Sequence, residues 1–158
     1  MKIDRETGVV ELPELGAALG PTTVRDAWLA SAAAQGSAVG VRNEPWCSYA
    51  ARAFAVDGRA WQLSASFHGQ TLWRVALVAL GEEFGAGWDG WSERKEQVRR
   101  VFQDRWLTQV LGGARTFAWG TVASVFDARG GSSSILVDYA VRDSLFHSAG
   151  STSWVMSR

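Results

Sequence analysis

The sequence predicts an α+β protein in which an antiparallel β-sheet, built from a meander and a hairpin, packs on one long amphipathic helix as a two-layer sandwich. Three observations lead to this prediction: apolar and polar residues alternate over residues 48–80, recur with helical spacing over 92–112, and alternate again over 117–139. Strands and helices do not alternate as they would in a parallel sheet. With 158 residues, the chain has the length of a single domain spanning 1–158.

The first 45 residues carry the weakest signals. Residues 9–12 indicate a short strand that stops at Pro13. A second strand is predicted over 22–31, with a helical turn at 30–34 as the alternative. Glycine, asparagine and proline then indicate a loop over 36–45.

The meander has the strongest strand signals. Residues 48–56 and 61–67 alternate, and the Asp57-Gly58 pair between them is typical of a tight hairpin whose central residues have positive φ. After a second turn, residues 71–80 are apolar on both faces except at Arg74. We therefore expect a central strand that is covered on both sides.

Residues 92–112 are predicted to form the helix. Glu93 and Glu96 fall in its first turn, near the positive end of the helix dipole, and Glu96 can pair with Arg100. The basic residues Arg94, Lys95, Arg99 and Arg100 are interpreted as a solvated face. The apolar stripe that should face the sheet comprises Val98, Phe102, Trp106 and Val110, flanked by Val101, Leu107 and Leu111.

A final hairpin should follow the helix. Residues 117–125 alternate as one strand, Asp127 begins a glycine-containing turn over 127–131, and residues 135–139 return against the first strand. Residues 141–158 are expected to be either a last strand or a loosely docked tail.

Composition limits the class of protein and its location. Hydrophobic residues make up 47% and charged residues 20%, which is typical of a globular chain, and the net charge is zero, which argues against a nucleic-acid-binding protein. The single cysteine, Cys47, fits a reducing compartment. The N-terminus lacks the apolar run of a signal peptide, and the longest apolar stretch, 75–80, is too short to span a membrane. We expect a soluble, cytoplasmic protein, a monomer or a homodimer, with no contact with a membrane.

The chain holds few of the residues that commonly act as metal ligands or catalytic nucleophiles. With two histidines and one cysteine, the chain has no zinc-ligand pattern, and neither a cofactor nor a metal is expected. Cys47 with His68 could form a thiol–imidazole pair, but Cys47 is interpreted as a small buried hydrophobic residue. Asp127 and Asp138 could face each other across the last hairpin, but Asp127 is better explained by its turn. No catalytic residue is assigned.

One segment carries a functional signal: the loop between the meander and the helix. Residues 81–93 are rich in glycine and combine carboxylates with large aromatic side chains, a combination found in recognition loops. For Trp91 a structural role is favoured, in which it packs the helix entrance against the sheet while the acids lie near the helix N-terminus. For Glu82, Glu83 and Phe84 both interpretations remain open. The candidate partner-binding residues are Glu82, Glu83, Phe84, Trp88, Asp89, Trp91 and Glu93.

Two stretches carry a resemblance to a family. WDGWSERKEQVRRVFQDRWLTQVLG has an acidic-aromatic helix entry, and FAWGTVASVFDARGGSSSILVDY has a Trp-Gly strand, an Asp-started turn and an Ile-Val-Tyr return strand. Together they resemble small cytoplasmic bacterial proteins of immunity type, the antidotes to secreted toxins. The resemblance covers about a third of the chain and implies a protein that binds and occludes a toxin, without catalytic residues.

The sequence thus favours a non-catalytic protein-binding protein, with a cognate protein toxin as its partner. An alternative of another class is a small-molecule-binding domain with an apolar cleft between sheet and helix, lined by Trp61, Trp73, Trp106 and Trp119. A third hypothesis is an enzyme that uses Asp127, Asp138 or Cys47.

Overall fold

The computed structural model describes residues 1–85 and 89–140. The long helix is α2 (Glu93–Leu111), and a short helix, α1 (Arg25–Ala30), lies near the N-terminus. Three short 3-10 turns are η1 (Pro13–Leu15), η2 (Ala32–Ala34) and η3 (Glu82–Phe84). The strands are β1 (Lys2–Ile3), β2 (Val10–Leu12), β3 (Ala17–Leu19), β4 (Ala38–Asn43), β5 (Trp46–Ala50), β6 (Phe54–Val56), β7 (Arg59–His68), β8 (Thr71–Ala79), β9 (Thr116–Phe117), β10 (Gly120–Asp127) and β11 (Ser132–Tyr139).

The strands form two antiparallel sheets. The large sheet has the order β4-β5-β7-β8-β11-β10-β9, with β6 paired to one end of β7. The small sheet has the order β1-β2-β3. The predicted α+β class, with antiparallel strands packed on one long helix, is therefore confirmed, and the sequence did not reveal that the N-terminal strands form a sheet of their own.

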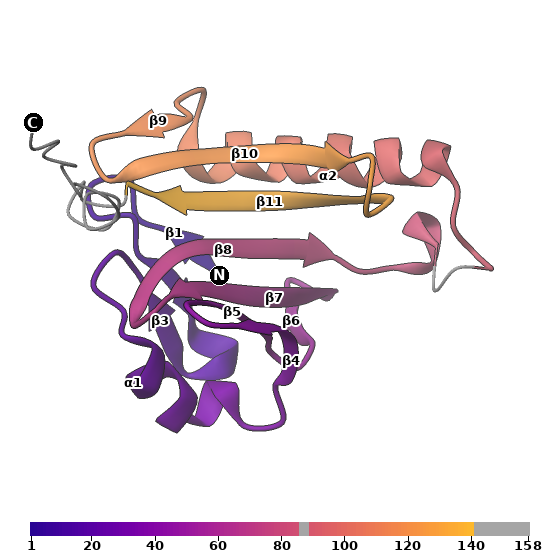
Figure 1. Cartoon of the computed structure of the whole chain (residues 1–158). Helices are drawn as coiled ribbons and strands as arrows, with labels where there is room; N and C mark the ends of the chain where they lie inside the picture. The colour runs from indigo at the N-terminus through magenta and orange to yellow at the C-terminus, as the bar shows by residue number, and fades with distance from the viewer. Residues whose placement is uncertain (86–88, 141–158) are drawn as a thin grey trace, which may run out of the picture.

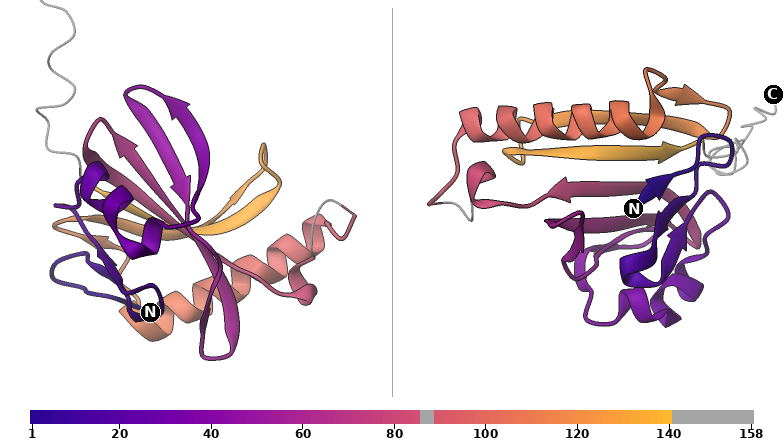
Figure 2. Two further views of the ribbon diagram at one scale, coloured as in Figure 1. Left: turned by 90° about the horizontal axis from the view of Figure 1, so that it is seen from below. Right: turned by 180° about the vertical axis from the view of Figure 1, so that it is seen from behind.

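The molecule is built in layers. Helix α2 and the small sheet lie on the same side of the large sheet, with α2 along β10 and β11 and the small sheet along β7 and β8 (Figure 1 and Figure 2). The core lies between these layers, and Trp61, Leu63, Phe67 and Leu77 are fully buried there. No helix of the described residues is long and apolar enough to cross a membrane.

The central part of the meander and the last hairpin follow the predicted pattern. Asp57 and Gly58 have φ angles of 49° and 75°, as the hairpin between β6 and β7 requires. Strand β11 pairs with β8 and joins the hairpin to the meander in one sheet. Residue Gly120 explains why 117–125 is not one strand: a two-residue turn separates β9 from β10, and the Gly120 backbone has a φ of 153°.

The N-terminal predictions were partly wrong. Residues 25–30 form α1 rather than a strand, and the alternative of a helical turn at 30–34 is realised as η2. The predicted loop 36–45 contains β4, all of whose residues are exposed because it is an edge strand of the large sheet. Local composition fails here because alanine and glycine carry little strand or helix information, and pairing with β5 decides the structure.

The predicted strand 48–56 is broken in two. Cys47, Tyr49 and Ala51 are buried in its first part, whereas Phe54 and Val56 are buried in its second part. The buried positions thus change parity between β5 and β6, which a single strand cannot do because its side chains alternate strictly. The break at residues 51–53 allows both parts to bury their apolar side chains.

Strand β8 is covered on one face only. Leu72, Val75 and Leu77 are buried, whereas Trp73 and Val78 are half-buried on the opposite face, so the expected cover on both sides was wrong. On that opposite face the Arg74 guanidinium donates two hydrogen bonds to Asp138 on β11, at 2.5 and 2.9 Å. This face of the sheet is not covered by a second layer of described residues (Figure 2).

Candidate functional site

The site lies where the loop 81–93 leads into helix α2. Ser92 has an extended backbone, and its hydroxyl oxygen accepts a hydrogen bond from the amide of Lys95 at 3.2 Å. This cap satisfies one of the free amides of the first turn, so that the helix begins at Glu93. The predicted helix 92–112 is confirmed to within one residue.

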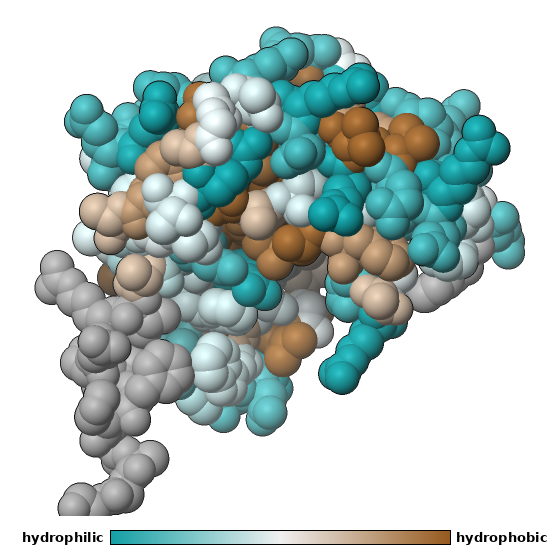
Figure 3. All heavy atoms as spheres, turned by 90° about the horizontal axis from the view of Figure 1, so that it is seen from above, coloured by the Kyte–Doolittle hydropathy of each residue, from teal (hydrophilic) through white to brown (hydrophobic). Residues whose placement is uncertain are grey.

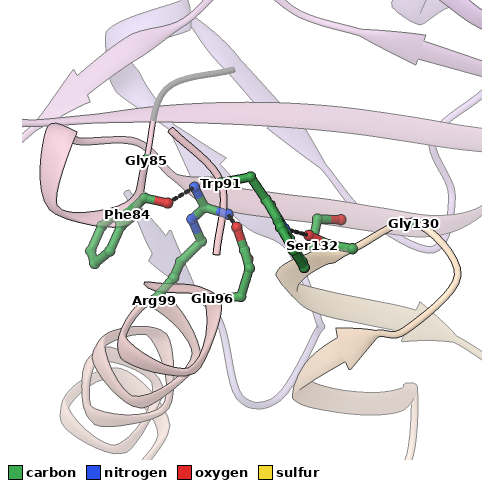
Figure 4. Close-up of a pocket in the computed structure, with 8 residues that line it drawn as sticks. Phe84, Gly85, Trp91, Glu96, Arg99, Gly130 and Ser132 are labelled. Atoms are coloured by element: carbon green, nitrogen blue, oxygen red, sulfur yellow. Dashed lines mark hydrogen bonds and ion pairs between the residues drawn. The ribbon is translucent and has the colours of Figure 1, made fainter. Parts of the chain in front are cut away.

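An ion pair is buried in the second turn of the helix. Glu96 and Arg99 are only 2% and 7% exposed, and the Arg99 guanidinium donates to the Glu96 carboxylate. A second guanidinium nitrogen donates to the carbonyl oxygen of Phe84 at 3.3 Å, as the close-up shows (Figure 4). Arg99 therefore fixes the end of η3 to the helix and at the same time neutralises a buried carboxylate.

The same carboxylate joins the helix to the last hairpin. Its other oxygen accepts from the amide of Ser133 at 2.7 Å, and the Ser133 hydroxyl donates to the Glu96 carbonyl at 2.9 Å. About two turns beyond Glu96, the Gln103 amide donates to the Ser133 carbonyl at 3.4 Å. Three segments distant in sequence are thus held together by a small polar network.

This network corrects two predictions about the helix. Glu96 pairs with Arg99 rather than Arg100, and Arg99 does not belong to a solvated face. The side chains that face the sheet are Glu96, Arg99, Gln103, Leu107 and Leu111.

The predicted apolar stripe is only partly the buried face. Val98 and Val101 are exposed, whereas Phe102, Trp106 and Val110 are half-buried and pack against the core, and the flanking Leu107 and Leu111 are fully buried. The sequence held a signal for the true face, because positions 96, 99, 103, 107 and 111 have the spacing of one helical face. The polar residues at its beginning concealed it.

A pocket of about 220 Å³ opens beside the ion pair. Its lining is formed by Trp91 together with the adjoining turn at Gly130 and Gly131, and by Phe84 and Ser132 (Figure 4). The Trp91 indole nitrogen donates to the Gly131 carbonyl at 2.5 Å. Trp91 consequently bridges the helix entrance and the hairpin, as the structural interpretation expected, and still exposes 42% of its surface.

The candidate partner-binding residues divide into several groups. Glu82, Asp89 and Glu93 are exposed, and within the part of the chain that the structure describes their carboxylates form no ion pair. Glu83 is exposed too, but Arg59 binds it at 2.5 Å, and this hydrogen bond lowers the pKa of the Glu83 carboxyl. Phe84 is 2% exposed and therefore belongs to the core, and Trp88 lies outside the described residues.

A second concave surface lies on the outer side of the helix. It is a groove of about 470 Å³ whose apolar surface comes from Val98, Val101 and Phe102. Arg94 and Arg105 lie along it, and the Arg59 guanidinium lies over the Phe102 ring, 4.3 Å from its centroid. Seen from above, the molecule shows small hydrophobic areas set among hydrophilic side chains (Figure 3). The sequence had assigned these valines to the buried stripe.

The four tryptophans of the proposed apolar cleft do not converge. Trp61 packs on Trp106, with ring centroids 5.3 Å apart, between sheet and helix. Trp73 lies against Trp46, at 5.6 Å, and Trp119 stacks on Phe117, at 4.9 Å. These are three separate clusters, so a single cleft lined by all four side chains does not form.

The residues of the catalytic hypothesis are likewise separated. In the register of β10 and β11, Asp127 pairs with Ser132 and Asp138 with Thr121, so the two aspartates lie at opposite ends of the hairpin. Asp127 accepts from the amide of Arg129 at 2.9 Å, which is the predicted turn role.

Cys47 and His68 occupy opposite faces of the sheet. Cys47 is buried and pairs in register with Phe67, whereas His68 is half-buried and its ring lies 4.5 Å from that of Trp46. The interpretation of Cys47 as a buried small residue is confirmed. Among residues 1–85 and 89–140, no three His, Cys, Asp or Glu side chains are grouped as a metal site would require.

The chain matches no protein-family model, no curated protein and no solved structure.

Proposed function

We propose that the protein is a non-catalytic binding protein of immunity type, which occludes a cognate protein toxin with the surface formed by the loop 81–93. The observation that carries the proposal is an exposed tryptophan, Trp91, in the same loop as the exposed carboxylates of Glu82, Asp89 and Glu93, which no described cation neutralises. Tryptophan is enriched among the residues that dominate protein interfaces, and free surface charge steers and orients a partner of opposite charge.

The rigidity of the supporting structure favours binding. The described parts of the loop are fixed by the Ser92 cap, by the Trp91–Gly131 hydrogen bond and by the contact of Arg99 with the Phe84 carbonyl. Because these bonds order the surface before a partner arrives, less conformational entropy is lost on association. The partner expected from the charge of this surface is a toxin with a basic patch.

Charge reversal tests the proposal. In the double variant Glu82→Lys/Asp89→Lys, neither substituted side chain takes part in a hydrogen bond of the described structure, so folding should be retained and circular dichroism should be unchanged. The matched control is Glu6→Lys/Glu11→Lys, two exposed carboxylates of the N-terminal region.

The assay is growth of the native host without its own copy of this protein, beside siblings that secrete toxin. We expect the wild type and the control to restore growth and the double variant not to, with the recovered toxin co-purifying only with the first two. Normal growth of a deletion strain beside its siblings, or equal protection by all three proteins, would refute the proposed function.

A further inference from the structure

The outer face of helix α2 carries a pattern that the proposed function does not use. Arg94, Val98, Val101 and Arg105 are spaced by four, three and four residues, so they lie on one face of the helix. All four are exposed, and both valines leave about half of their surface open, at 48% and 51%. The face therefore consists of two apolar side chains bracketed by two cations about 16 Å apart along the axis.

This face continues into the groove beside it. Phe102 is half-buried next to Val98 and Val101, and the Arg59 guanidinium covers its ring. Arg59 is neutralised by Glu83 at 2.5 Å. Arg94 and Arg105, in contrast, meet no carboxylate in residues 1–85 and 89–140, and their charges remain uncompensated.

We propose that this groove is a docking site for an acidic amphipathic helix of a partner protein. Apolar residues of such a helix would pack on Val98, Val101 and Phe102, and its carboxylates would pair with Arg94 and Arg105 at the two ends of the contact. Helix-in-groove recognition uses the spacing that this surface offers, with apolar anchors three and four residues apart. The site goes beyond the proposed function, because the acidic loop 81–93 attracts the opposite charge.

The charges of the groove distinguish an acidic partner helix from two other possible occupants, a second copy of the protein and residues 141–158 of the same chain. If a second copy bound through a twofold axis between Val98 and Val101, Arg94 of each copy would face Arg105 of the other, and like charges would repel. Residues 141–158 of the same chain contain Arg142 and Arg158 against one carboxylate, Asp143, and so do not supply the negative charge that the groove lacks.

The test uses two labelled helical peptides of roughly 18 residues, or about 27 Å of helix. Both contain alanine and a leucine stripe with three- and four-residue spacing; one carries glutamates beside the stripe, and the other carries lysines in their place. Fluorescence anisotropy measures binding to the full chain. We expect the acidic peptide to bind, more weakly as salt rises, and the basic peptide not to bind at this groove.

The protein variants assign the binding to the groove. Arg94→Glu/Arg105→Glu should weaken the acidic peptide on the order of tenfold and gain affinity for the basic one, whereas the control Arg42→Glu/Arg52→Glu, on exposed arginines elsewhere, should do neither. Val98→Ser/Val101→Ser should weaken the acidic peptide without creating affinity for the basic one.

Several results would overturn the docking site. These are no binding of the acidic peptide by the wild type, unchanged binding of it by Arg94→Glu/Arg105→Glu or Val98→Ser/Val101→Ser, or an equal loss in the control variant. A wild-type dimer in sedimentation that Arg94→Glu/Arg105→Glu or Val98→Ser/Val101→Ser dissociates would assign the surface to a second copy instead. None of these measurements involves toxin protection, so the two proposals stand or fall separately.

Discussion

Removal of Arg99 should destabilise the protein strongly. The guanidinium is 7% exposed, pairs with a carboxylate that is 2% exposed, donates to the Phe84 carbonyl, and lies 5.4 Å from the Phe84 ring centroid. In the variant Arg99→Met these interactions are lost and the Glu96 charge remains buried without its cation. Leaving one member of a buried ion pair alone costs about 3–5 kcal/mol.

That loss is large compared with the total stability of a domain, which is about 5–15 kcal/mol. It corresponds to a fall in melting temperature of about 6–20 °C for a chain of this size. The double variant Glu96→Gln/Arg99→Met removes both charges, while the glutamine side-chain oxygen can still accept from the Ser133 amide. We therefore expect the double variant to lie within about 1–2 kcal/mol of the wild type and above Arg99→Met in stability.

Urea unfolding followed by tryptophan fluorescence measures the free energies of unfolding of Arg99→Met, of Glu96→Gln and of the double variant. Arg105→Met, at an exposed arginine of the same helix, serves as the control and should change stability by less than about 0.5 kcal/mol. The reasoning fails if Arg99→Met costs less than about 1 kcal/mol, or if the effects of the two substitutions simply add.

Two further substitutions test the packing of β10 and β11. Gly120→Ala should lower the free energy of unfolding in urea by about 2–4 kcal/mol, because a Cβ at this φ of 153° would lie 1.9 Å from the Asp138 carbonyl oxygen. The control is Gly113→Ala, where a Cβ meets nothing within 4 Å and which should be nearly neutral. Burial raises the pKa of the Tyr139 hydroxyl, which donates to the carbonyls of Gly8 and Leu19. As pH rises, the Tyr139 hydroxyl therefore loses its proton in the unfolded chain before it does so in the folded protein. The free energy of unfolding should fall as pH rises above about 10, and Tyr139→Phe should remove this contribution to its pH dependence. An unchanged slope in Tyr139→Phe, or a neutral Gly120→Ala, would contradict these two expectations.

The parts of the fold that the sequence predicted are those with local signals. The Asp57-Gly58 pair requires a specific backbone geometry, and the helix is delimited by Ser92 at one end and Gly112 at the other, so these elements were found to within a residue or two. The strands β7 and β11 alternate in sequence because one of their faces is buried and the other is not.

The remaining elements depend on distant contacts. Strand β4 has no alternation, since every one of its residues is exposed, and it is a strand because it pairs with β5. The parity change at residues 51–53 follows from where β6 meets β7. Neither fact is encoded in a window of neighbouring residues.

The sequence indicated the loop 81–93 as a candidate site and did not indicate the residues that support it. Glycine, acidic and aromatic side chains indicated the loop 81–93, and Trp91 and Asp89 are exposed there. The buried pair Glu96–Arg99 was missed because charged residues on a helix usually lie in water. It is buried here only because Ser133 and the Phe84 carbonyl supply the partners that offset desolvation.

The two halves of helix α2 are attached to the rest of the molecule by different forces. Toward its C-terminus the helix is held by hydrophobic packing, which has no preferred direction and involves Leu107, Leu111 and the Trp61–Trp106 contact. Toward its N-terminus the attachment is a set of oriented bonds for which water competes as soon as a gap opens. Under mild denaturant the end of the helix next to the loop should therefore detach and fray before the other, as a partial opening with a free energy below that of global unfolding. A partner bound to the loop would stabilise this end of the helix against local unfolding, and amide hydrogen exchange there would become slower.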